Sequence, residues 1–166
     1  VVEAVRSFGD WPLDYLINSA AAGNGSPKWI DATADEFMQR FRIGAVGPYL
    51  TTKAFYPQLK KSEKPFVINI SSNVGSISEN GSGGNLSYRT SKAALNIITV
   101  DLARELAAEK ISFVALSPGW VQTKMSNWTG PAQPPEAVEE MIKVIDGLET
   151  SETPKFLHRK GHEIGW

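Results

Sequence analysis

The sequence has no cysteine among its 166 residues, so it can form neither disulfide bonds nor thiolate metal sites. No apolar run is long enough to span a bilayer, and the chain starts without a basic and apolar leader. Neither sign of charge dominates, because 17 basic and 18 acidic side chains leave a net charge of −1. We therefore expect a soluble, cytoplasmic protein that binds neither nucleic acid nor a membrane, with a small neutral molecule as its partner.

Histidine is also scarce, since His158 and His162 are the only two. They lie on either side of a turn at Gly161, and no third ligand is near them in the sequence. A pair of histidines without further ligands is a weak signal for zinc, so we expect no metal site.

Four short apolar segments stand out against this background, and the chain length suits one domain, residues 1–166. Most of them are nearly continuous apolar runs, as a parallel sheet buried on both faces requires. Helical patterns at 31–61, 88–110 and 134–149 alternate with them, which predicts an α/β fold with a doubly wound parallel sheet and helices on both faces. The predicted strands are "LDYLIN" (13–18), "PFVINIS" (65–71), "SFVALS" (112–117) and "KFLHR" (155–159).

The first of these helices has a recognisable start and an irregular middle. Thr33 is a suitable N-cap, and Glu36 follows at the spacing of a capping box. Gly44, Gly47 and Pro48 predict a kink or a tightened turn further along.

Ligands of such sheets bind at the carboxyl ends of the strands, where this chain has the small and hydroxylated segments "NSAAAG", "SSNVG" and "SPGWVQT". Tyr88 and Lys92 follow the second segment, four positions apart at the start of a helix, and therefore share one face. At ~6 Å and an effective dielectric of ~20, the ammonium would favour the phenolate by about 3 kcal/mol, which predicts a tyrosine pKa near 8. Ser72 could polarise the same substrate oxygen. A structural reading stays open, in which Tyr88 half-buries its ring and Lys92 solvates the helix.

Four ordered motifs carry a resemblance to a known family. They are "LINSAA" (16–21), "INISSNVGS" (68–76), "YRTSKAALN" (88–96) and "SPGWVQTKM" (117–125). Together they resemble the short-chain dehydrogenase/reductase family, and within it the branch of C-factor (C-signal)-like proteins and carbonyl reductases. The resemblance covers nearly the whole chain.

This resemblance implies roles for individual residues. Tyr88 would be the general acid/base, Ser72 would position and polarise the substrate oxygen, and Lys92 would tune the tyrosine and hold the nicotinamide ribose. Ser72 is preferred to Ser71 because the family serine precedes a glycine by three residues, which fits Gly75. The implied cofactor is NAD or NADP, and the remaining residues expected to border it are Asn18, Ala20, Pro118, Gly119, Val121 and Thr123.

The chain also departs from the family pattern. Gly44 stands where the family has an asparagine that supports a water relay, and Ser19 and Ala21 replace an asparagine and a glycine of the first motif. No glycine-rich pyrophosphate turn follows a strand. We therefore expect residues 1–166 to form a partial Rossmann-type domain that lacks the N-terminal dinucleotide-binding unit, entering at the end of the family's third helix with "VVEAVRSFG".

The implied activity is an NAD(P)-dependent oxidoreductase that interconverts a carbonyl and a secondary alcohol by hydride transfer. Two alternatives remain, a non-catalytic signalling or interaction protein of the C-factor type and an inactive C-terminal fragment of a longer reductase. A homo-oligomer is expected through the helices at 33–61 and 88–110, with apolar area from Phe55, Tyr56 and Leu59.

Overall fold

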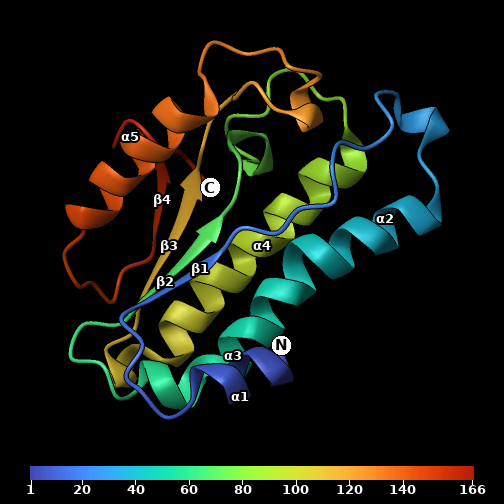
Figure 1. Ribbon diagram of the computed structural model, residues 1–166. Helices are drawn as coiled ribbons and strands as arrows, with labels where there is room; N and C mark the ends of the chain where they lie inside the picture. The colour runs from blue at the N-terminus through green and yellow to red at the C-terminus, as the bar shows by residue number, and fades with distance from the viewer.

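Four parallel strands form one sheet in the order β1-β2-β3-β4, in a computed structural model that describes residues 1–166 (Figure 1). Each strand lies within a segment predicted from the sequence, so the α/β expectation is confirmed. The bounds are β1 Tyr15–Asn18, β2 Phe66–Ile70, β3 Ser112–Ser117 and β4 Lys155–His158.

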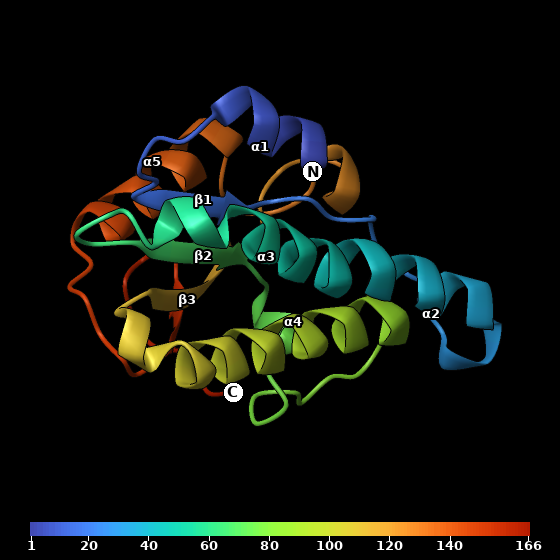
Figure 2. The ribbon, with the colours of Figure 1, turned by 90° about the horizontal axis from the view of Figure 1, so that it is seen from below.

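Helices cover both faces of the sheet, as expected for a doubly wound fold. On one face, α1 (Val2–Phe8), α3 (Gly47–Leu59) and α4 (Leu86–Glu105) share a core with β1, β2 and β3. On the other, α5 (Pro134–Asp146) packs its apolar side on β2, β3 and β4. Figure 2 shows the strands between α5 and the layer of α3 and α4. Short 3-10 turns occur at Trp29–Asp31, Asn73–Gly75, Ala107–Glu109 and Lys124–Ser126.

The long helical segment after β1 is interrupted where glycines were expected to distort it. It consists of α2 (Ala34–Phe41), a π-helical turn (Arg42–Val46) and α3. Thr33 is the N-cap of α2, because its hydroxyl accepts a hydrogen bond from the Glu36 backbone N–H at 3.2 Å. The carboxylate of Glu36, however, does not close the capping box, because it bonds Ser26 and Ser87 instead.

Two expectations about apolar residues need correction. In β1 only Leu16 and Asn18 are buried, while Tyr15 and Ile17 are 44% and 49% exposed, because α5 packs on the other strands. Phe55 and Leu59 belong to the core below α3, and the half-buried Tyr56 donates its hydroxyl to Glu109. These three side chains therefore offer little surface to a second subunit. None of the helices combines the length and the apolar character that crossing a membrane would demand.

Candidate active site

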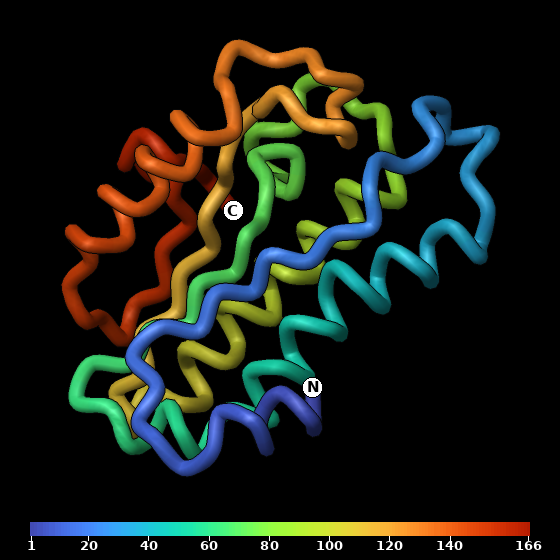
Figure 3. The backbone as a smooth tube through the Cα atoms, viewed as in Figure 1, coloured from blue at the N-terminus to red at the C-terminus, as the bar shows by residue number.

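The loops that follow β2 and β3 meet the start of α4 at one end of the sheet, which Figure 3 shows as the green and orange loops above the strands. A cavity of about 670 Å³ lies there. Its lining includes six of the residues singled out from the sequence, namely Ser72, Tyr88, Pro118, Gly119, Val121 and Thr123. Segments more than forty residues apart in the sequence thus form one pocket.

The two serines at the end of β2 have different partners. Ser71 is buried and donates its hydroxyl to the Asn96 side chain at 2.6 Å, so it serves to fasten β2 to α4. Ser72 lines the cavity, and its hydroxyl accepts a long 3.4 Å bond from the Val74 backbone N–H. The geometry therefore supports Ser72 as the residue that can contact a ligand.

Gly75 allows the loop carrying Ser72 to lie against α4. A Cβ at this position would come within 2.7 Å of the Lys92 Cβ and 3.0 Å of its carbonyl carbon. Because the helix backbone cannot yield at such distances, any larger residue would move the loop away from α4. The spacing from Ser72 to Gly75 is thus a packing requirement of the site.

Tyr88 and Lys92 lie together, but their electrostatics differ from the expectation. Burial raises the pKa of Tyr88, and a side-chain hydrogen bond with Ser72 lowers it by less. The Lys92 ammonium lies 5.9 Å from the tyrosine ring centre and donates to the Ile70 carbonyl at 2.7 Å. Burial lowers the pKa of Lys92 to about 8. The predicted fall of the tyrosine pKa is therefore wrong for this structure, because the desolvation of a buried phenolate outweighs the hydrogen bond with Ser72.

The loop after β3 is held by buried polar groups. Ser117 donates its hydroxyl to the Asn73 side chain at 2.8 Å and accepts from the Gly119 backbone N–H at 3.2 Å. Arg159, which directly follows β4, donates to the Pro118 carbonyl at 2.6 Å and pairs with Glu140 of α5.

Gly119 permits this close packing. It has a φ of 67°, and a Cβ there would come within 2.5 Å of the Arg159 guanidinium.

The C-terminal residues brace the loop after Ser72 from outside. Ser76 donates its hydroxyl to the Gly165 carbonyl at 2.5 Å, and the Ser78 backbone N–H donates to the Trp166 carbonyl at 3.0 Å. The Trp166 ring packs on Phe156 of β4 with centroids 5.4 Å apart. The end of the chain thus belongs to the framework of the site.

Asn18 and Ala20, expected on the ribose and adenine side, do not line this cavity. The Asn18 carboxamide donates to Asn69 at 2.9 Å and to Thr52 at 3.4 Å, and these bonds hold it in the interior. Ala20 is exposed just beyond β1. Their roles toward a cofactor stay predictions.

Gly44, in the π-helical turn, is buried beside α4. A Cβ at this position would lie 3.3 Å from the Ser91 hydroxyl, which itself donates to the Tyr88 carbonyl at 2.7 Å. A larger side chain would therefore press on the helix that carries Tyr88. The consequence of this glycine for proton exchange stays a prediction.

The sequence reading missed two sets of residues around the cavity. The sequence pattern predicts only a strand end at Arg159, and no local pattern signals its bond to the loop after β3. The second set did leave a signal, because its spacing is that of one helix face. These residues line the cavity from α5 and are Pro134, Ala137, Val138 and Met141.

The residues suit the nicotinamide end of a dinucleotide. Tyr88 and Lys92 lie one turn apart on α4, and Gly119 presents bare backbone to the cavity between the side chains of Pro118 and Trp120. The tyrosine, the serine and the proline-glycine loop lie at the carboxyl edge of a parallel sheet, where α/β sheets of this kind bind their ligands.

Comparison with known proteins identifies the protein family. Residues 1–133 match the family described as short chain dehydrogenase. The chain belongs to the short-chain dehydrogenase family.

The chain is similar to proteins of two kinds, a C-signal protein and carbonyl reductases. The C-signal protein of Myxococcus xanthus is 35% identical over 155 residues, which make up 93% of each chain. Among solved structures, carbonyl reductase Sniffer of D. melanogaster superposes with a TM-score of 0.92 at 30% identity, covering 99% of this chain and 71% of that one. The NADPH-bound carbonyl reductase from chicken fatty liver gives 0.92 at 32% identity, covering 99% and 72%. The family and the NADPH-bound structure support NAD or NADP as the cofactor class.

Proposed function

We propose that this chain carries the substrate site and the acid/base residues of an NAD(P)-dependent reductase that interconverts a carbonyl and a secondary alcohol. The observation that supports this most is the shared cavity, in which Ser72 and Tyr88 face the loop at Pro118–Thr123. The carbonyl reductases among its structural relatives point to the same reaction.

The proposed chemistry assigns each polar group one task. A bound nicotinamide cofactor would supply the hydride for the carbonyl carbon. Ser72 donates a hydrogen bond to the carbonyl oxygen, which stabilises the negative charge that develops there. Tyr88 gives its hydroxyl proton to that oxygen as the alcohol forms. Lys92 would hold the ribose hydroxyls of a bound nicotinamide cofactor.

The raised pKa of Tyr88 favours the reductive direction. A buried phenol stays protonated at neutral pH, so it is ready to act as an acid toward a carbonyl. Oxidation of an alcohol would first require the phenolate, which burial disfavours.

Tyr88→Phe tests the assignment, with Tyr49→Phe as the matched control on the exposed face of α3. Oxidation of NADPH in the presence of an aromatic aldehyde is the readout, at cofactor concentrations in the millimolar range. We expect Tyr88→Phe to lower kcat by about two to four orders of magnitude while the circular dichroism spectrum is kept. Turnover that survives this substitution would remove Tyr88 from the mechanism.

A second function is favoured by one specific observation. The C-signal protein matches over 93% of both chains, whereas the chain covers 71% and 72% of the two carbonyl reductases. We therefore propose, as the alternative, a non-catalytic signalling or interaction protein. Undetectable turnover by the folded wild-type chain, at saturating cofactor, would favour this alternative over the reductase.

A further inference from the structure

The cavity that contains Ser72 and Tyr88 has no charged side chain in its lining. All 19 lining residues are apolar, hydroxyl-bearing, glycine or asparagine, although 21% of the whole chain is charged. The polar groups that face the cavity are therefore hydroxyls and carboxamides, which keep no charge at neutral pH.

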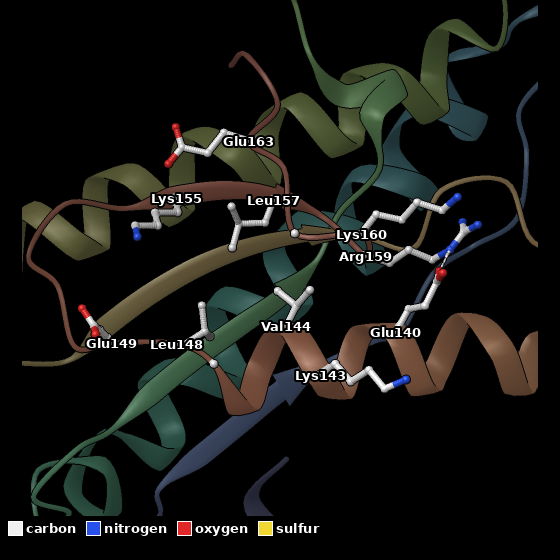
Figure 4. Close-up of a pocket in the computed structure, with 12 residues that line it drawn as sticks. Glu140, Lys143, Val144, Leu148, Glu149, Lys155, Leu157, Arg159, Lys160 and Glu163 are labelled. Atoms are coloured by element: carbon white, nitrogen blue, oxygen red, sulfur yellow. Dashed lines mark hydrogen bonds and ion pairs between the residues drawn. The ribbon is translucent and has the colours of Figure 1, made fainter.

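A second cavity has a charged lining, so the lack of charge is specific to the cavity that contains Ser72 and Tyr88. It has a similar volume, about 690 Å³, and lies between α5 and β4 (Figure 4). Its lining contains cations and carboxylates together, namely Lys143, Lys155, Arg159, Lys160, Glu140, Glu149 and Glu163. The two sides of α5 thus border cavities of opposite character.

One wall of the uncharged cavity is apolar and belongs to α5. Its four residues recur at helical spacing, from Pro134 to Met141, so that one face of the helix points to the ligand space. Val138 is 48% exposed, and Trp120 and Met125 from the loop after β3 extend the apolar lining. The Asn24 carboxamide donates to the Met125 carbonyl at 2.7 Å, which fixes this loop against the one after β1.

We propose that this cavity selects neutral carbonyl compounds with an apolar aryl or alkyl body, and that the wall formed by Pro134, Ala137, Val138 and Met141 carries the selection. This substrate class rests on the proposed reductase function but makes a separate claim about binding. A carboxylate entering the cavity loses water and meets no cation in its lining. Its neutral ester loses far less on entering, and its methyl group gains apolar contacts.

The test compares two probes that differ only in charge, 4-formylbenzoate and its methyl ester. Saturation-transfer NMR titrations of the full chain measure binding without any turnover. We expect the ester to bind at least about tenfold more tightly than the carboxylate, a difference of about 1.4 kcal/mol.

Val138→Lys locates the selection on α5. A lysine there introduces a cation at the apolar wall, so 4-formylbenzoate should gain about fivefold or more in affinity while the ester gains nothing. Ile142→Lys is the matched control, because Ile142 lies on the same helix, is 50% exposed and lines neither cavity. That control should leave the preference for the ester unchanged.

Several results would overturn the proposal. Equal affinities of the two probes for the wild-type chain would do so, as would equal effects of Val138→Lys and Ile142→Lys. Failure of the ester to bind up to its solubility limit would also overturn it. A preference for the ester that shrinks in Val138→Lys, without oxidation of NADPH by the wild-type chain, would support the neutral site and contradict the reductase function instead.

Discussion

Ser87 donates its hydroxyl to the Glu36 carboxylate, although 51 positions separate the two residues. The same carboxylate accepts the Ser26 hydroxyl at 2.6 Å and the Ser26 backbone N–H at 2.8 Å. Because Ser87 immediately precedes Tyr88, Glu36 joins the loop after β1 to the start of the helix that carries the tyrosine. The bonds from Ser26 and Ser87 lower the pKa of Glu36 to about 2.

Glu36→Gln should therefore reduce stability most at neutral pH. The folded-state pKa is depressed, so the stabilisation is present above about pH 4.5 and is lost as the pH falls toward 2. Thermal unfolding from pH 7 to pH 3 should show a Tm several degrees below wild type at pH 7 and a gap that narrows with acid. Glu139→Gln, at an exposed ion pair with Lys143, should change Tm little. A Tm difference between wild type and Glu36→Gln that stays constant from pH 7 to pH 3 would contradict this account.

Gly75→Ala should disturb the site through packing alone. The added methyl would press on the backbone of α4 at Lys92, so we expect a loss of about 1–3 kcal/mol in urea unfolding and a lower kcat as Ser72 moves. Gly81→Ala is the control, since nothing lies within 4 Å of a Cβ there. Equal stability of the two variants would show that the loop can yield at no cost.

Lys92 should make the protein more stable as the medium becomes alkaline. Its pKa is about 8 when folded against 10.5 for the free side chain, so the unfolded chain holds more protons between these values. Stability then rises with pH, by roughly 2 kcal/mol from pH 7 to 9.5, until ionisation of Tyr88 in the unfolded chain opposes it above about pH 10. Urea unfolding of wild type and Lys92→Met at both pH values measures the difference. A variant that gains as much as wild type would refute the assignment to Lys92.

The affinity for NADPH tests how much of the binding free energy comes from contacts to the nicotinamide end and how much from contacts to the pyrophosphate. The proposed site provides groups for the nicotinamide end, and the 166 residues contain no glycine-rich turn for pyrophosphate. Micromolar binding corresponds to a binding free energy of about 8 kcal/mol, and the pyrophosphate contacts supply several kcal/mol of it. Because the isolated chain lacks these contacts, it should bind NADPH with a Kd in the millimolar range. Calorimetry measures this directly, with a longer form that restores the strand-turn-helix unit as the comparison. Micromolar binding by the 166 residues would show that other contacts hold the cofactor.

A homo-oligomer remains a prediction, with different residues from those first expected. Leu50 on α3 and Ile97 on α4 are 47% and 56% exposed, whereas Phe55 and Leu59 are in the core. Sedimentation velocity should show a dimer or larger species that Leu50→Glu with Ile97→Glu shifts toward monomer. A wild-type monomer at all concentrations would count against this surface.

The sequence was sufficient for the strands and for the cavity-lining residues that follow β2 and β3, but not for Asn18 and Ala20 after β1. The continuous apolar run "SFVALS" predicted a strand that the structure buries along its whole length, and the choice of Ser72 over Ser71 followed from the spacing to Gly75. Local patterns could not reveal long-range partners. Glu36 fits a capping box, but two serines distant in sequence compete for its carboxylate.

The pKa of Tyr88 shows a second limit. The sequence gives the i,i+4 spacing to Lys92, from which attraction between the two can be estimated. It does not give the burial of the ring, which depends on how the loops close over α4 and which reverses the sign of the shift. The same holds for Phe55, whose place in the core depends on the packing of α1 and α3.

The contacts of Gly165 and Trp166 decide where a reporter group can be attached. A fluorophore or affinity tag joined at Trp166 would disturb the hydrogen bonds of Gly165 and Trp166 with Ser76 and Ser78. Its signal would then report the disturbed loop as well as ligand binding. Lys28, exposed in the loop between β1 and α2, has no such bond to the loop after Ser72. Immobilisation through an N-terminal tag therefore leaves the bonds to Ser76 and Ser78 undisturbed, whereas a label at position 28 would lie two residues from Ser26 and its bonds to Glu36.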